Sequence, residues 1–238
     1  MSSLSRYDLQ ALIFDTYGTV VDWRTTVLEA LRALGRARTL SLDWEAFLEQ
    51  WLQTRAILDR INADELPWMT MEEVHRLALQ APLAHHRLTL TDEELDGLVR
   101  ARWRLRPWPD SVAGLTRLKQ TYVISPMSNA SVAGMVRLAK FAGLPWDCVI
   151  TAENARRYKP HPDAYRTAVS LLGLRSEQVM LVAAHNYDLR AAQSHGLHTA
   201  FVPRPTEYGP RQTTDLAPEG EWTVVAKDFL DLATRLGA

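Results

Sequence analysis

Residues 11–23 read ALIFDTYGTVVDW, and the fold that we predict starts from this segment. Ala11–Phe14 is a short apolar run that ends at Asp15, and the chain then turns at Gly18. A run of four apolar residues bounded by turn chemistry is typical of a strand buried on both faces of a parallel sheet. We therefore expect a central strand whose carboxyl end carries Asp15.

The rest of the chain repeats this pattern and alternates it with helical periodicity. Four further apolar runs predict strands, at Tyr122–Ser125, Cys148–Thr151, Val179–Ala183 and Thr199–Val202. Between them, apolar residues at three- and four-residue spacing predict helices at Ser111–Gln120, Val132–Ala142, Ala164–Leu172 and Leu189–His195. Alternating strands and helices favour the α/β class, with a Rossmann-like parallel-sheet core and helices on both faces.

The segment from Val27 to Arg104 is different, because nearly every window in it has helical periodicity. Helices are expected at Thr25–Gly35, Asp43–Arg60, Met71–Leu79 and Asp92–Trp103, and Thr91 with Glu94 has the spacing of a capping box. We expect a helical cap domain, 23–105, inserted after the first strand of a core domain, 1–22 plus 106–238. The Pro-, Gly- and Thr-rich tail, 203–221, should cross the surface before a last strand and helix.

Composition restricts the classes of function. The 238 residues carry a formal net charge of −1 and no basic run interleaved with aromatic residues, which gives no reason to expect a nucleic-acid partner. No run of 18 apolar residues predicts a membrane span, and the N-terminus lacks the pattern of a signal peptide. The single cysteine, Cys148, lies in an apolar stretch that we interpret as a buried approach to a strand. We expect a soluble, cytoplasmic protein.

Polar residues follow the predicted strands at once. They are Asp15 and Thr19, the pair Ser128 and Asn129, Lys159, and Asp188. Ligands of open parallel sheets bind at the carboxyl ends of the strands, so these side chains predict one site. Taken singly, each has an ordinary alternative: Asp15 and the Ser-Asn pair as turn residues, and Lys159 as a solvated surface lysine.

Four segments together resemble the motifs of the haloacid dehalogenase superfamily, in order: FDTYGTVVDW (14–23), SNAS (128–131), YKPHPDAY (158–165) and AAHNYDLRAAQSHGLHTAFVPRP (183–205). The chain is most similar to the type II subgroup, the hydrolytic (S)-2-haloacid dehalogenases. The resemblance implies that Asp15 displaces halide from C2 of a 2-haloacid with inversion. Water would then hydrolyse the aspartyl ester with help from Asp188, while Lys159 keeps Asp15 ionised. It also implies that Tyr17, Thr19, Ser128, Asn129 and Tyr165 bind substrate or order the site.

Position 17 distinguishes carbon from phosphorus chemistry. Phosphatases of this superfamily have a second aspartate there, and an additional acidic residue near the last strand completes their Mg²⁺ site. This chain has Tyr17, which is a poor acid at neutral pH, and the later strand end offers only Asp188. We therefore expect metal-independent chemistry on a small-molecule substrate, with no cofactor.

The chain departs from the subgroup at positions that bind the leaving group. A Trp-Arg pair on the cap, whose arginine cradles the halide, aligns with Trp51-Leu52, and Arg55 is the substitute that we expect on the same helical face. The usual Ser and Asn of the last motif are Ala183 and His185, followed by Asn186. Some members, including defluorinating ones, share this AAHN sequence, so His185 either narrows the halide pocket, donates a hydrogen bond to fluoride, or bonds to the backbone.

Three functions stay open at this point. The first is a dehalogenase of short haloalkanoates, including haloacetate or fluoroacetate. The second is a phosphatase acting on a small phosphorylated metabolite, and the third is a catalytically impaired relative that serves as a binding protein. A homodimer is expected from relatives, although nothing in the sequence requires one.

Overall fold

The computed structural model describes residues 9–238. The first eight residues of the predicted core domain, where we expect no signal peptide, lie outside this range. The rest of the core domain is built on a six-stranded parallel sheet with strand order β5-β4-β1-β6-β7-β8. The strands are β1 (Ala11–Phe14), β4 (Val123–Ser128), β5 (Ile150–Thr151), β6 (Val179–Ala183), β7 (His198–Phe201) and β8 (Val224–Val225). The predicted α/β fold is confirmed.

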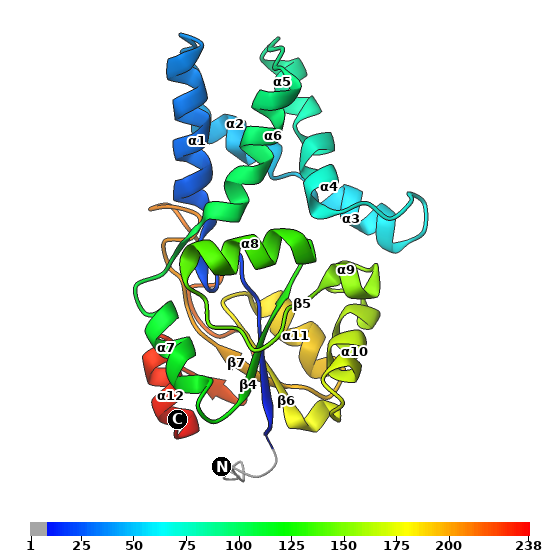
Figure 1. Ribbon diagram of the computed structural model, residues 1–238, viewed down its shortest axis with the longest axis vertical. Coiled ribbons are helices and arrows are strands. Elements are labelled where there is room, and N and C mark those ends of the chain that lie inside the picture. Colours follow the sequence, from blue (N-terminus) through cyan, green and yellow to red (C-terminus); the bar gives the residue numbers. More distant parts are fainter. Residues whose placement is uncertain (1–8) are drawn as a thin grey trace.

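The central strand β1 is buried on both faces because helices cover each of them (Figure 1). Leu12 and Phe14 belong to a core that includes α7 (Ser111–Leu118) and α12 (Phe229–Leu236). Ala11 and Ile13 point to the opposite core, with α10 (Pro162–Leu171) and α11 (Asn186–Ser194). The alternation of side chains along a strand thus places every residue of ALIF in an apolar layer.

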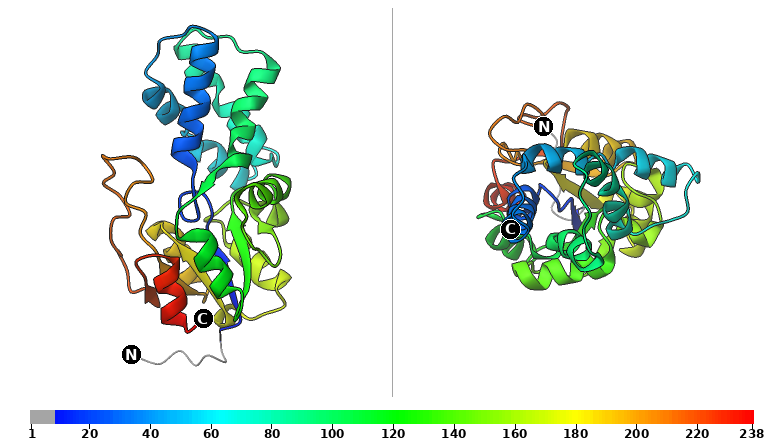
Figure 2. Two further views of the ribbon diagram at one scale, coloured as in Figure 1. Left: turned by 60° about the vertical axis from the view of Figure 1, so that its left-hand side comes forward. Right: turned by 90° about the horizontal axis from the view of Figure 1, so that it is seen from above.

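Two short elements and one longer helix complete the core. Helix α8 (Val132–Ala142) follows β4, α9 (Ala152–Ala155) follows β5, and the 3₁₀ turn η2 (Ser176–Gln178) leads into β6. The tail, 203–221, has no regular helix or strand and runs beside the core (Figure 2). Among residues 9–238, no helix is both long and apolar enough to cross a bilayer.

The segment 23–104, inserted after β1, is helical and stands above the carboxyl edge of the sheet (Figure 1). Its elements are α1 (Trp23–Ala37), α2 (Trp44–Trp51), α3 (Arg55–Asn62), α4 (Met71–Ala78), α5 (Gln80–His85), α6 (Asp92–Arg100) and the 3₁₀ turn η1 (Ala101–Arg104). The predicted capping box is confirmed, with Thr91 and Glu94 bonded reciprocally. Two short strands, β2 (Val21–Asp22) and β3 (Arg106–Pro107), pair antiparallel where the chain enters and leaves this segment. Their pairing supports our proposed division at residues 23 and 105.

The helix predicted over 43–60 is wrong, because the chain breaks between α2 and α3 at Leu52–Thr54. The two halves pack in different places. Trp51 is fully buried in the large core, whereas Leu58 packs in a separate cluster with Tyr158 of the core domain. One straight helix over 43–60 would not place Trp51 in the large core and Leu58 against Tyr158 at the same time.

The prediction of a buried Cys148 is also wrong, because its side chain is exposed. The strand begins only at Ile150, since the preceding residues bend around Asp147. Asp147 exchanges hydrogen bonds with the backbone of Ile124, through its N–H and its carboxylate, and this leaves Cys148 on the outside of the bend.

Candidate active site

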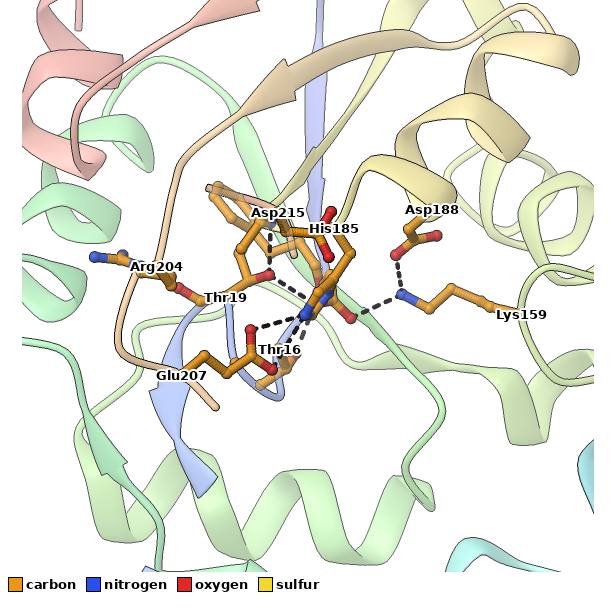
Figure 3. A network of polar contacts seen from close by, with 12 residues as sticks. Thr16, Thr19, Lys159, His185, Asp188, Arg204, Glu207 and Asp215 are labelled. Carbon is orange, nitrogen blue, oxygen red and sulfur yellow. Dashed lines mark hydrogen bonds and ion pairs between the residues drawn. The ribbon is translucent and has the colours of Figure 1, made fainter. Parts of the chain in front are cut away.

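The polar residues that follow separate strands meet at the carboxyl edge of the sheet, as the sequence predicts. Asp15 comes directly after β1, Ser128 ends β4, and Asp188 lies in the first turn of α11 after β6. Lys159 reaches the same place from the loop between α9 and α10. Figure 3 shows Lys159 and Asp188 side by side at this place, with Thr19, His185 and Glu207 next to them.

Asp15 is buried and has a donor on each carboxylate oxygen. Lys159 Nζ lies 2.9 Å from Oδ1, while Thr19 Oγ1 donates to Oδ2 at 2.6 Å and His185 Nδ1 lies 3.0 Å from the same oxygen. Burial by itself would raise the pKa of Asp15, but Lys159, His185 and Thr19 together hold that pKa well below its usual range. Asp15 is therefore an ionised carboxylate at neutral pH.

Lys159 lies between two carboxylates, and its side chain is 1% exposed. It contacts Asp188 Oδ2 as well as Asp15, and the Tyr165 hydroxyl donates to Asp188 Oδ1 at 2.6 Å. Burial opposes the charge of Lys159, yet the two carboxylates raise its pKa above the ordinary value. Burial and repulsion from Asp15 raise the pKa of Asp188, although Lys159 and Tyr165 act in the other direction. A raised pKa makes Asp188 the better proton acceptor of the two carboxylates.

Asn129 fixes the loop that carries Lys159. Its Oδ1 accepts from the backbone N–H of Lys159 at 2.8 Å, and its Nδ2 donates to the carbonyl of the same residue at 3.4 Å. The predicted Ser-Asn pair therefore does two things: Asn129 holds the lysine, and Ser128 lines the cavity described below.

His185 has a partner that sequence reasoning missed. Its Nε2 lies 2.9 and 3.1 Å from the two carboxylate oxygens of Glu207, while Nδ1 faces Asp15. Burial lowers the pKa of His185, but Glu207 and Asp15 outweigh it and raise that pKa well above its usual value. Two of the expected alternatives for His185 are thus corrected: its ring bonds to carboxylates rather than to backbone, and both ring nitrogens face carboxylates rather than a site for fluoride. A halide pocket narrowed by the ring stays a prediction.

Glu207 reaches the site because the tail is anchored at Arg204. The Arg204 guanidinium forms two contacts with Asp110, at 2.7 and 2.9 Å, and donates to the carbonyl of Thr19. The N–H of Glu207 then bonds to the carbonyl of Arg204, which turns its side chain inward to accept from Trp23 Nε1 at 2.9 Å. The signal in the sequence is weak, because a charged residue in a polar tail normally faces solvent.

A cavity of about 440 Å³ lies between the site and the helical segment. Six of the predicted residues line it besides Asp15: Tyr17, Arg55, Ser128, Asn129, Lys159 and His185. Its apolar wall includes Leu52, Leu58 and Met71. Thr19 and Asp188 are not part of this lining but bond to it, Thr19 to Asp15 and Asp188 to Lys159. Tyr165 bonds in turn to Asp188. Burial and the nearby Glu72 raise the pKa of Tyr17, so its phenol stays protonated.

Two predicted contacts need correction, and a third, at Arg55, arises from a different helix than expected. Trp51 does not line the cavity, since its indole is buried in the cap and donates to the carbonyl of His75 at 2.8 Å. Asn186 does not line it either, because its side chain bonds to Asp215 and to the tail backbone. Arg55 does line it, but from the start of a new helix and with its Nε paired to Asp59.

A second cap arginine was not anticipated. Arg102 is 5% exposed, its guanidinium lies 4.2 Å from the centroid of the Trp51 ring, and its terminal nitrogens have no hydrogen-bond partner among residues 9–238. Burial lowers the pKa of Arg102 to about 10, although Tyr17 and Glu72 act to raise it. Arg102 is thus a buried cation behind the cavity wall.

The donor set does not fit a divalent cation. The Lys159 ammonium contacts both Asp15 and Asp188, so the two carboxylates that would ligate Mg²⁺ already share a positive charge. Within the part of the chain that the structure describes, no three His, Cys, Asp or Glu residues are grouped as metal ligands.

Comparisons with known proteins agree with this geometry. The sequence model of the haloacid dehalogenase-like hydrolase family matches residues 9–196 of this chain. The structure of a defluorinating L-2-haloacid dehalogenase is 43% identical with a TM-score of 0.93, covering 97% of this chain and 96% of that one. Another L-2-haloacid dehalogenase structure is 40% identical with a TM-score of 0.90, covering 96% and 99%. The (S)-2-haloacid dehalogenase 4A of Burkholderia cepacia is 28% identical over 84% of this chain and 87% of its own length.

Proposed function

The chain belongs to the haloacid dehalogenase-like hydrolases, in the L-2-haloacid dehalogenase group, and from that premise we propose that it hydrolyses the carbon-halogen bond of short 2-haloalkanoates. The observation that carries the proposal is Asp15, an ionised carboxylate at the floor of a partly apolar cavity, held by Lys159. A carboxylate of this kind is a nucleophile that divides one difficult displacement into two easier steps.

In the first step an oxygen of Asp15 attacks C2 of the haloacid from the side opposite the halogen. The new C–O bond forms as the C–halogen bond breaks, and the halide leaves with the bonding electrons. The product is an ester between Asp15 and the carboxyalkyl group, with inverted configuration at C2. Lys159, Arg55 and the polar lining at Ser128 and Asn129 provide the side chains that would receive the carboxylate of the substrate.

In the second step water attacks Cγ of Asp15, and the bond between Cγ and the ester oxygen breaks to release the 2-hydroxyacid. Asp188 takes the proton from water and the departing alkoxide receives a proton in turn. The raised pKa of Asp188 and its bond from Tyr165 support this role. Because carbon chemistry of this kind needs no Lewis acid, the lysine between the carboxylates supports metal independence.

The size and lining of the cavity support small substrates. Three apolar side chains, Leu52, Leu58 and Met71, line the same cavity as Asp15, and an apolar lining of this kind would limit the access of water to the carboxylate. His185 occupies the place beside Asp15 together with Glu207, which leaves less room for the leaving group than a smaller amide would. Haloacetates, including fluoroacetate, are therefore the first substrates to test.

The experiment is a halide-release panel. Purified protein is incubated with chloroacetate, fluoroacetate and both enantiomers of 2-chloropropionate in the presence of EDTA, and free halide is measured. We expect release that EDTA does not reduce, and none from Asp15→Asn. Asp64→Asn is the matched control, because Asp64 is an exposed carboxylate outside the cavity. Its backbone is in the left-handed region, which asparagine also tolerates.

The same panel tests the other two functions. Phosphate release from p-nitrophenyl phosphate that requires Mg²⁺, without halide release, would establish a phosphatase instead. If protein that melts cooperatively releases neither halide nor phosphate, the chain is a catalytically impaired relative.

A further inference from the structure

The two oxygens of Asp15 are not equivalent. Oδ2 accepts from Thr19 Oγ1 at 2.6 Å and faces His185 Nδ1 at 3.0 Å, whereas Oδ1 has Lys159 as its partner at 2.9 Å. The Thr19 hydroxyl has one proton, and its oxygen accepts from the N–H of Ala184 at 2.9 Å, so its proton points to Oδ2. With two donors on Oδ2, the freer lone pairs are on Oδ1, and Oδ1 is the oxygen that attacks.

His185 faces a carboxylate at each ring nitrogen. An ionised carboxylate only accepts hydrogen bonds, so both nitrogens must donate and the ring is an imidazolium. Glu207 is 2% exposed and is held by the Trp23 indole, which leaves it little freedom to turn away. The other groups near the ring are Tyr187 and Tyr208, with centroids 5.9 and 6.5 Å away, and Lys159 on the far side of Asp15. The raised pKa of His185 agrees with this assignment.

Once Oδ1 has become the ester oxygen, Oδ2 is the carbonyl oxygen of the ester. Water then forms a bond to Cγ, the π electron pair moves to Oδ2, and the proton of the water passes to Asp188. Negative charge therefore develops on the atom that already has the Thr19 hydroxyl and the His185 N–H aimed at it. Donors fixed in place around a developing oxyanion are among the largest contributors to catalysis.

We propose that Glu207 is a positioning residue for ester hydrolysis: it orients and charges His185, which with Thr19 forms an oxyanion site at Oδ2 of Asp15. This inference rests on the aspartyl-ester mechanism proposed above. The carboxylate of Glu207 does not touch the reacting atoms, and it acts through the imidazolium. Its removal affects the second half-reaction more than the first, because charge builds on Oδ2 only when water attacks.

The test is a comparison of the two half-reactions in wild type and Glu207→Gln with chloroacetate. The glutamine keeps a hydrogen-bond partner for His185 Nε2 but lacks the negative charge of Glu207. A neutral His185 can therefore still donate from Nδ1 to Asp15 Oδ2. In Glu207→Gln we expect a chloride burst of one equivalent per active site, followed by a steady rate about 10- to 100-fold slower than that of wild type. This loss is smaller than the one that follows complete removal of an oxyanion donor. Intact-protein mass spectrometry should detect the accumulated carboxymethyl ester in the variant.

A pH profile separates this role from a structural one. The steady rate falls as pH rises through the pKa of His185, because the imidazolium is lost, and in Glu207→Gln that fall should occur at lower pH. Glu207→Asp keeps the charge and should retain the profile of the wild type. Glu219→Gln is the matched control: it neutralises an exposed carboxylate of the same tail, paired with Arg190 outside the cavity, and should leave the profile unmoved.

Direct observation of the imidazole keeps the inference testable if Glu207→Gln fails to fold. In wild-type protein labelled at its 7 histidines, the His185 ring signals, assigned with His185→Asn, should be those of an imidazolium at neutral pH. A neutral ring there, or a Glu207→Gln enzyme with no ester accumulation and an unmoved pH profile, would overturn the inference. Wild-type protein that releases no halide would instead refute the proposed function.

Discussion

Replacing Lys159 by methionine removes the cation that two buried carboxylates share. Lys159 Nζ lies 2.9 Å from Asp15 Oδ1 and also contacts Asp188. At an effective dielectric of about 20, one ion pair at this distance attracts by about 6 kcal/mol. Desolvation offsets part of that, and loss of one partner from a buried pair costs about 3–5 kcal/mol of unfolding free energy. The melting temperature should fall by roughly 6–20 °C for a chain of this size.

The loss should depend on pH in a defined direction. Without the cation, burial and repulsion from Asp15 leave the pKa of Asp188 raised above its value in the unfolded chain. A carboxyl group with a raised pKa in the folded state loses stability as pH rises through the interval between the two pKa values. The deficit of Lys159→Met relative to wild type should therefore be larger at about pH 8 than at about pH 5.

Urea denaturation followed by tryptophan fluorescence at both pH values measures this deficit. Lys140→Met is the matched control, because Lys140 is an exposed lysine of α8 and its loss should change the free energy of unfolding by about 0.5 kcal/mol or less. A deficit that is equal at both pH values, or no larger than that of the control, would refute the argument that Lys159 neutralises the two carboxylates.

Three further changes test other contacts. Tyr165→Phe removes the donor to Asp188, so the pKa of Asp188 should rise and the acid limb of the activity profile should move to higher pH; an unmoved limb would exclude Asp188 as the base. Gly18→Ala places a Cβ at a φ of +88° against the carboxylate of Glu207, so it should lower the melting temperature and shift the pH profile as Glu207→Gln does. Arg102→Met removes a buried cation without hydrogen-bond partners in residues 9–238, and should raise the free energy of unfolding by about 1 kcal/mol in urea; a clear loss would reveal an unseen partner.

Much of the site was predictable because it is encoded by strand ends. ALIF followed by Asp15, and VMLVA followed within a few residues by Asp188, are local signals, since a buried parallel strand must be apolar along its length. Parallel strands then bring their carboxyl ends to one edge of the sheet. Lys159 needed the resemblance of its motif, because a lysine in a loop has no local signal for burial.

Sequence patterns and motifs were enough to predict the α/β order, the helical segment inserted after β1, and the group of Asp15, Lys159 and Asp188. Tertiary structure alone decided that Glu207, 22 residues after His185 and in an irregular tail, completes the site. It also decided the break after Trp51 and the burial of Arg102, whose terminal nitrogens have no hydrogen-bond partner among residues 9–238. The difference lies in the sequence distance over which these interactions act. Hydrogen-bonded turns and side-chain periodicity act over a few residues, whereas a buried charge acquires its partner only when segments distant in sequence pack together.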